Sequence, residues 1–451
     1  MNRLRYEHLL IPSFLALVLA YPQPAGAAAL SPIESLGKNV FFDKISKPED
    51  QQACASCHDP KKGGTLPNSV VNETIVVAPG AKPKRLGNMK TPTNTYATFI
   101  PPFRFLSSPP AFVPPWEGGN FWDGRAEGFG VQDLRDGGGP SDDDPLGDSN
   151  VSLTVTLNDL PPTKRAAYEK YLGPTADQAL NPFPNKVEQN IRIRRVCKTV
   201  QDASYSYLYT LAFGEPISCR PADFLTSYKR IAVSLAAYQA SVEVNPFSSK
   251  RDKALASDAD KHFPLDGLSQ QENLGHDLFY GRARCVGCHN GVPQGDVLVG
   301  DGTEPRQLYT DQLYHNIGTP FNREIPTVVK GEKTGLTAHV TSVDAGHVKT
   351  PTLRNVAKGA TKKFTKAYTH NGWFKSLKSL VHFYNTRDAL GPDCETRWGI
   401  VDATEEEALA NNCWPKPEFP DTAAAFVVGN LGLSSAEEDA IVAYLATLSD
   451  K

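Results

Sequence analysis

Methionine is nearly absent from this sequence, because its 451 residues contain only Met1 and Met89. An excess of charge of one sign is also lacking, since 47 basic and 50 acidic residues give a formal net charge of -3. No stripe of Lys and Arg is visible, which argues against nucleic-acid binding. Strand-like alternation of apolar and polar residues is scarce, so a sheet-based fold is not expected.

Only one long hydrophobic run is present, LLIPSFLALVLA at residues 9–20. Arg3 and Arg5 precede this run and the small residues PAGAAA follow it, as in a secretory signal peptide. The run is too short to cross a bilayer comfortably. We therefore expect residues 1–29 to be a signal peptide, cleaved near Ala27 or Ala29, and the mature protein to reach the periplasm without a membrane span.

Eight cysteines are present, and four of them lie in the repeated pattern CxxCH. In an oxidising compartment the other four can form disulfides. The simplest pairing joins neighbours in sequence, Cys197 with Cys219 and Cys394 with Cys413. The other two connectivities and buried free thiols stay open.

Helical patterns are easy to find. Residues 269–272 and 434–437 each begin with Ser and end with Glu, which predicts capping boxes at two helix starts. The Pro- and Gly-rich stretches 100–120 and 136–150 are typical of long surface loops. One further helical face consists of apolar residues three or four apart: Phe224, Tyr228, Ile231, Leu235, Tyr238 and Val242. The sequence therefore predicts a mainly α protein.

Three elements recur in the same order along the chain. LGKNVFF (36–42) precedes CASCH, LGHDLFY (274–280) precedes CVGCH, and KTPT follows each motif at 90–93 and 349–352. Duplication of one module explains this order. The polar stretch 245–266 is the expected junction, so we predict domains at 30–250 and 251–451.

The two CxxCH motifs are the strongest chemical signal. Two thiols and an imidazole at this spacing can attach a c-type haem, with the His as proximal iron ligand. A zinc site built from both CxxC pairs and a thioredoxin-like dithiol are the alternatives, but neither explains the His after each pair. The predicted haem attachments are Cys54, Cys57 and His58 in the first motif, and Cys285, Cys288 and His289 in the second.

The opposite side of the first haem lacks an obvious ligand. His58 is the last histidine before His262, and Met89 is the only methionine after the first residue. Unless Met89 or a residue of the other domain binds this iron, it is open to a small molecule. Met89 can equally be a packing residue of its loop.

The second module has no methionine, but SLKSLVHFY (376–384) contains an apolar helical face that ends in a phenol. This face comprises Leu377, Leu380, Val381 and Tyr384, whereas His382 points elsewhere. Tyr384 would bind ferric iron as phenolate and disfavour Fe(II). A tyrosine of the hydrophobic core is the alternative.

Several stretches together resemble those of the bacterial di-haem cytochrome c peroxidases, and within them the MauG-like branch. The resemblance covers nearly the whole mature chain. Its matching stretches are KISKPEDQQACASCHDP, NFWDGRAEGFGVQ, LFYGRARCVGCHNG, VKTPTLRNV and AYTHNGWFKSLKSLVHFYNTRD.

This resemblance implies a mainly α fold of two cytochrome c-like helical domains, each with one covalently bound haem c and long loops. It implies that the N-terminal haem reacts with H2O2, that Trp122 relays electrons between the haems, and that Gln132 lies on the open side. It also favours Tyr384 as sixth ligand of the second haem, because MauG-like members have Tyr at that position.

The sequence departs from the family pattern in three places. The acidic residue expected on the open side is not identified among Asp142, Asp143, Asp144 and Asp148. A distal His soon after the first CxxCH, found in Met-ligated members, is missing. The family's inter-haem calcium ligands correspond to Lys90, Thr365 and Ala367, and since a lysine cannot coordinate calcium, calcium is doubtful.

Two enzymatic functions and one non-enzymatic function follow. The oxidising equivalents from H2O2 are used to oxidise a partner protein, or small electron-donor proteins such as a cytochrome or cupredoxin remove them. Tyr384 favours partner oxidation, because a haem biased against Fe(II) accepts electrons poorly. A non-catalytic di-haem electron carrier is the third hypothesis.

Overall fold

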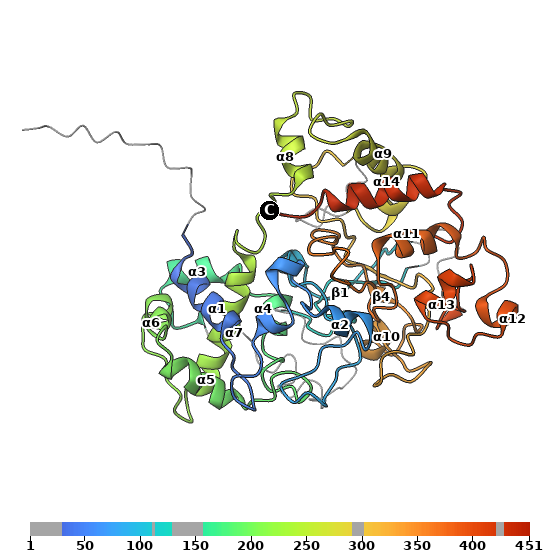
Figure 1. The fold of residues 1–451 in the computed structure, drawn as a ribbon. Coiled ribbons are helices and arrows are strands. Elements are labelled where there is room, and N and C mark those ends of the chain that lie inside the picture. Colours follow the sequence, from blue (N-terminus) through green and yellow to red (C-terminus); the bar gives the residue numbers. More distant parts are fainter. Residues whose placement is uncertain (1–28, 111–112, 129–156, 291–301, 421–427) are drawn as a thin grey trace, which may run out of the picture.

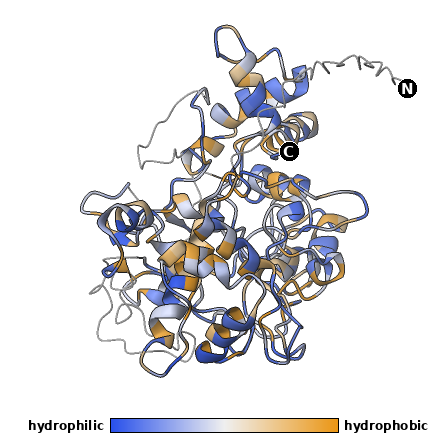
Figure 2. Cartoon of the chain, turned by 90° about the vertical axis from the view of Figure 1, so that its left-hand side faces the viewer, coloured by the Kyte–Doolittle hydropathy of each residue, from blue (hydrophilic) through white to orange (hydrophobic). Residues whose placement is uncertain are grey.

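The computed structural model describes residues 29–110, 113–128, 157–290, 302–420 and 428–451. These residues form mainly helices, which confirms the predicted fold class (Figure 1). Most helices carry both hydrophobic and hydrophilic residues, as expected of amphipathic helices that cover a core (Figure 2). In the described part of the chain no helix has the length and apolar character needed to cross a membrane.

The N-terminal core is built around the contact between α1 (Pro32–Phe42) and α7 (Phe224–Ala240). A Pro at the start of α1 and the capping box of Ser31 and Glu34 fix where this helix begins. The apolar side chains of α1 and α7 join one hydrophobic cluster. The other helices before residue 241 are α2 (Ser69–Glu73), α3 (Pro162–Glu169), α4 (Pro174–Gln178), α5 (Ile193–Asp202) and α6 (Tyr207–Phe213).

The C-terminal core repeats this arrangement with α9 (Gln270–Tyr280) and α14 (Ser435–Ala446). Both helices begin with the predicted capping boxes. The other helices are α8 (Lys250–Ser257), α10 (Leu336–His339), α11 (Leu377–Thr386), α12 (Cys394–Trp398) and α13 (Glu405–Ala410). In Figure 1 the helices of the two cores form separate groups, and the C-terminus lies between them.

A glycine marks the same place in both helix pairs. A Cβ atom on Gly37 of α1 would collide with the backbone oxygen of Ser234 in α7. A Cβ atom on Gly275 of α9 would collide with that of Ala440 in α14. The glycines of the repeated LGKNVFF and LGHDLFY stretches therefore allow two equivalent close helix crossings, as expected of a duplicated module.

Strands are few and short in the described residues. β1 (Arg104–Phe105) pairs with β2 (Trp116–Glu117), and β3 (Tyr314–His315) pairs with β4 (Val348–Lys349), both antiparallel. The prediction that residues 100–120 form a surface loop holds only in part: residues 104–110 are mostly exposed, but β1 and β2 lie in this stretch and Phe103 and Trp116 are buried. Their rings stack 4.9 Å apart in a small core with Tyr314, so aromatic packing outweighs the Pro-rich composition.

Two other sequence predictions can be compared with the structure. The predicted disulfides Cys197–Cys219 and Cys394–Cys413 are present. Val242, however, does not belong to the apolar helical face, because α7 ends at Ala240 and the Val242 side chain is 53% exposed. The spacing continued past the end of the helix by coincidence.

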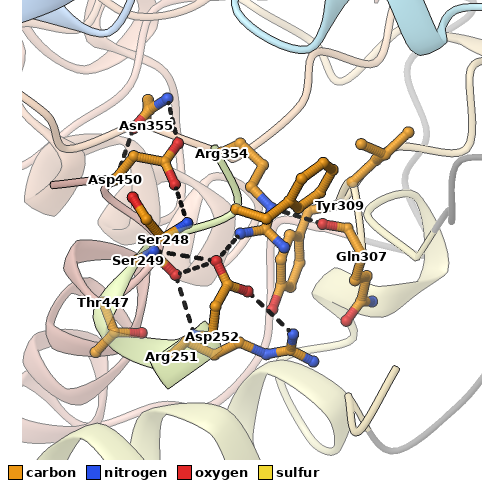
Figure 3. Close-up of polar contacts among 12 residues, drawn as sticks. Ser248, Ser249, Arg251, Asp252, Gln307, Tyr309, Arg354, Asn355, Thr447 and Asp450 are labelled. Atoms are coloured by element: carbon orange, nitrogen blue, oxygen red, sulfur yellow. Dashed lines mark hydrogen bonds and ion pairs between the residues drawn. The ribbon is translucent and has the colours of Figure 1, made fainter. Parts of the chain in front are cut away.

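The junction stretch 245–266 is folded and holds buried charge. Arg251 of α8 and Arg354 are both inaccessible to solvent or nearly so. Arg354 Nη1 donates to the Asp252 carboxylate at 2.5 Å, and Ser249 Oγ donates to the same carboxylate at 2.8 Å (Figure 3). A boundary between residues 250 and 251 remains a prediction.

Candidate active site

The first CxxCH motif begins in a single 3-10 turn, Cys54–Ser56. Its side chains lie deep in the protein but keep part of their surface free. Burial lowers the pKa of His58 to about 4, so its ring is neutral. The His58 Nδ1 donates to the Gly64 carbonyl at 3.0 Å, which leaves the Nε2 lone pair free for a metal.

The second motif has the same local structure, with the turn at Cys285–Gly287. Burial lowers the pKa of His289, and its Nδ1 donates to the Tyr309 carbonyl at 2.9 Å. A backbone hydrogen bond with Pro92 acts against this lowering of the His58 pKa, and one with the equivalent Pro351 does so for His289. The repeated KTPT stretches thus help to orient the histidines of the two motifs.

A cavity of about 620 Å³ lies beside the first motif. Cys57, His58 and Trp122 line it, together with Met89, whose sulfur is a potential iron ligand. The buried Oε1 of Gln52 and Oδ1 of Asn181 on the wall have no hydrogen-bond partner among the described residues. A large group with polar edges therefore fits this space, and a covalently attached haem fits the thiols and the neutral imidazole.

A second histidine, His339 of α10, also lines this cavity. It is buried, and its Nε2 lies 3.0 Å from Oε1 of the buried Glu127. His339 comes from the C-terminal half of the chain, where sequence reasoning had allowed for a ligand without naming one. This contact meets only the distance of an ion pair, because His339 Nε2 makes no hydrogen bond among the described residues.

Trp122 is buried, and its Nε1 donates to the Lys90 carbonyl at 2.8 Å. Its side chain lines the His58 cavity and also a smaller cavity of about 50 Å³. Leu308 and Thr310, the neighbours of Tyr309, line this second cavity with Pro351. The indole thus lies between the surroundings of the histidines of the two motifs.

Tyr384 lies on α11, whose N-terminus is capped by Ser376: the Ser376 side chain accepts a hydrogen bond from the Ser379 amide. Burial raises the pKa of Tyr384, and the nearby thiols of Cys285 and Cys288 raise it further. The phenol is therefore close to the second motif, as the helical face predicted. His382 points elsewhere, also as predicted, because its Nδ1 contacts Glu438 Oε1 at 2.9 Å.

The family model "Di-haem cytochrome c peroxidase" matches residues 32–260. The chain belongs to this family. Methylamine utilization protein MauG of Paracoccus denitrificans is 28% identical over 439 residues, which are 93% of this chain and 89% of that protein. Cytochrome-c peroxidase IdrP2 of Denitromonas iodatirespirans is 29% identical, but over only 33% of this chain and 41% of its own. The chain is thus a MauG-like member of the family.

Solved structures show the same fold. The di-haem peroxidase BthA from Burkholderia thailandensis superposes with a TM-score of 0.65 at 24% identity, over 94% of this chain and 87% of that one. A MauG-like protein associated with microbial copper homeostasis gives a TM-score of 0.56 at 19% identity, over 98% and 96%. As a family member, the protein is an oxidoreductase of the di-haem peroxidase type with two c-type haems.

The structure adds a residue that sequence reasoning missed, Glu188. It lines the His58 cavity, and burial raises the pKa of its carboxyl although Arg125 opposes this effect. Asn185 Nδ2 donates to Glu188 Oε1 at 2.9 Å. No local pattern marks this glutamate, because its position depends on how residues 178–188 fold against the motif. Gln132 and the four aspartates considered for the open side lie outside the described residues.

The zinc alternative gains no support. In the described ranges, the one group of at least three potential ligands is Cys288, Asp311 and His315, which lies within the second module. No such group joins the two CxxC pairs. Separate haem sites fit this arrangement better.

Proposed function

We propose that the protein is a periplasmic enzyme that reduces H2O2 at the N-terminal haem and uses the resulting oxidising equivalents on a partner protein. In this proposal Cys54, Cys57 and His58 hold the first haem, and Cys285, Cys288, His289 and Tyr384 hold the second. Trp122 relays electrons between them, and Gln132 belongs to the open side. The haem domains are 30–250 and 251–451, after a signal peptide at 1–29.

The observation that carries the proposal is the asymmetry between the two sites. Tyr384 lies beside the thiols of the second motif, whereas the first motif opens on a cavity of about 620 Å³. A haem closed by an oxygen ligand stores oxidising equivalents, and no tyrosine among the described residues lines the cavity in which the first haem would lie, so the iron there keeps a position for a small molecule. Two haem sites with such different roles are expected of an enzyme rather than of a simple electron carrier.

The chemistry can be written as a balanced step. Bound haem supplies the iron at which H2O2, two electrons and two protons become two water molecules. Glu188 holds a proton in the cavity and delivers it to the departing oxygen. Trp122 carries electrons from the second site to the first, and the partner protein finally loses two electrons and two protons.

The competing hypothesis is a peroxidase that takes electrons from small redox proteins. Relatives with the name cytochrome-c peroxidase match about a third of this chain, whereas MauG matches 93% of it. The extent of this similarity and the position of Tyr384 favour oxidation of a partner protein. An inter-haem relay is common to both hypotheses.

Rapid mixing with H2O2 tests the proposal. The wild-type protein should change its spectrum at both haems, with no external reductant present. In Trp122→Phe the first haem should still respond, while the response of the second slows by at least tenfold. Trp398→Phe, at a 54% exposed tryptophan, is the matched control. A wild-type protein that does not react with H2O2 would leave only the electron-carrier function, and fast turnover with a reduced cytochrome would favour the ordinary peroxidase.

A further inference from the structure

Lys90 occupies a central and buried place between the two haem sites. Its side chain is 8% exposed and lines the His58 cavity, and its ammonium lies 5.8 Å from the centre of the Trp122 ring. The Lys90 amide donates to the His370 carbonyl at 2.8 Å, and its own carbonyl accepts from Trp122. Lys90 thus connects the first KTPT stretch to Trp122 and to the C-terminal half.

The charge of this lysine lacks an anionic partner within the described ranges. Its ammonium donates to the Thr91 carbonyl at 3.1 Å, and none of the ion pairs among the described residues includes it. Burial lowers the pKa of Lys90 to about 8. A buried ammonium is costly unless an anion compensates it. A haem carries two carboxylate side chains, and the haem held by His58 would bring these into the same cavity.

The residues do not fit the calcium ion that the family resemblance implies between the haems. An ammonium replaces the expected oxygen ligand at Lys90, and the Thr365 carbonyl already accepts from Asn72 Nδ2 at 3.0 Å. A second buried ammonium, that of Lys366, stands next to Thr365 in sequence. Burial, together with the nearby charge of Lys90, lowers its pKa to about 7. A divalent cation would meet repulsion from both.

The Lys366 ammonium is surrounded by backbone carbonyl oxygens, as a bound metal ion would be. It donates to three backbone carbonyls, those of Lys62, Asn355 and Lys358, at 3.0–3.1 Å. These carbonyls come from both halves of the chain. The nitrogen of a protein side chain therefore already occupies a group of carbonyls, of the kind that could bind a cation, where the halves meet.

We propose that the Lys90 ammonium is a built-in cation that pairs with a carboxylate of the N-terminal haem and makes this protein independent of calcium. The inference rests on haem binding and not on the identity of the substrate. A fixed positive charge beside a haem favours its reduced state. The same charge near Trp122 disfavours a positive hole on the indole, so the hole passes on to the second haem.

Calcium content tests the first half of the proposal without any variant. The purified holoprotein is dialysed first against EGTA and then against about 1 mM calcium, a concentration that suffices for weak extracellular-type sites. Elemental analysis should then find less than one calcium ion per chain. The haem spectra should be the same in both buffers. One tightly held calcium per chain, or a spectrum that EGTA changes and calcium restores, would overturn the proposal.

Charge substitution tests the second half. Lys90→Met should lower the midpoint potential of the N-terminal haem, and Lys90→Arg should restore most of it, as measured by spectroelectrochemistry on resting protein. Lys229→Met is the control, because Lys229 is equally buried but does not line the cavity. Equal potentials in wild type and Lys90→Met would disprove the pairing. Because no substrate is added, these results are independent of the proposed function.

Discussion

Tyr384 is a residue at which burial and the proposed binding of iron have opposite effects on the pKa of the phenol. Burial raises the pKa of its phenol, so without a metal the hydroxyl stays protonated. Ferric iron provides the positive charge that would hold it as phenolate. Tyr384→Phe should therefore change the spectrum of the second haem and raise its midpoint potential, because the ligand that stabilises Fe(III) is lost.

Tyr280→Phe provides the control for this substitution. Tyr280 lies in the same core, and its hydroxyl donates to Gln307 Oε1 at 2.7 Å. Removal of that hydroxyl should leave both haem spectra unchanged. If Tyr384→Phe is spectrally identical to the wild type, the tyrosine is a core residue and the sixth ligand is another group.

Glu188 should matter for the reaction with H2O2 rather than for haem binding. Glu188→Gln preserves size but removes the proton donor, and the rate of reaction should fall by about 10²–10⁴-fold in rapid mixing. Because the pKa of Glu188 is raised, the wild-type rate should decline as pH rises through that pKa, above the usual range of a glutamate. The variant should lose this step in its pH profile.

Glu243→Gln is the control, because Glu243 pairs with Lys38 at 2.6 Å away from the cavity. A Glu188→Gln protein with the wild-type rate and pH profile would show that another group delivers the proton.

The residues that could be predicted are those whose chemistry depends on local spacing. The CxxCH turn positions two thiols and a histidine within five residues, and the face that ends in Tyr384 follows from one helical period. Glu188 and His339 reach the His58 cavity through the tertiary fold, from positions far along the chain. No spacing rule brings such residues together, so the sequence could not identify them.

The α1–α7 and α9–α14 pairs are the elements that support the two motifs. Each pair crosses at a glycine, and the helix that contains this glycine leads into a CxxCH turn. Helix existence was predictable from capping boxes, but the end of α7 was not, because Val242 continues the apolar spacing beyond it. The β1–β2 hairpin was missed because its aromatic core depends on Tyr314, which lies far along the chain.

Gly275→Ala should destabilise the C-terminal helix pair. The added methyl group meets the Ala440 carbonyl of α14, a backbone atom that cannot turn aside. Overpacking of this kind costs about 1–3 kcal/mol or more, which exceeds the ~0.5–1 kcal/mol that Ala gains over Gly inside a helix. Denaturant unfolding of the holoprotein should therefore show a lower midpoint. Gln271→Ala, at an exposed position of the same helix, should not, and equal stability of both variants would refute the close crossing.

At the scale of the whole molecule, the chain end joins the two halves. The Asp450 carboxylate accepts from Tyr96 Oη at 2.7 Å, from Asn355 Nδ2 at 3.0 Å and from the Ser248 amide at 2.8 Å. Figure 3 shows Asp450 between Ser248 and Asn355. Tyr96 belongs to the stretch after the first KTPT, and Asn355 to the stretch after the second. One buried side chain thus holds both modules and the junction.

Asp450→Asn should weaken this connection, because the new amide NH2 faces a donor on whichever side it turns. An unsatisfied buried donor costs about 1–3 kcal/mol. In a domain of about 150–250 residues, each kcal/mol lowers the melting temperature by roughly 2–4 °C. Calorimetry of the holoprotein should show a lower melting temperature and a wider separation between the transitions of the two halves. Lys451→Ala, at the exposed last residue, should melt like the wild type. If Asp450→Asn also does so, the halves are held together by other contacts.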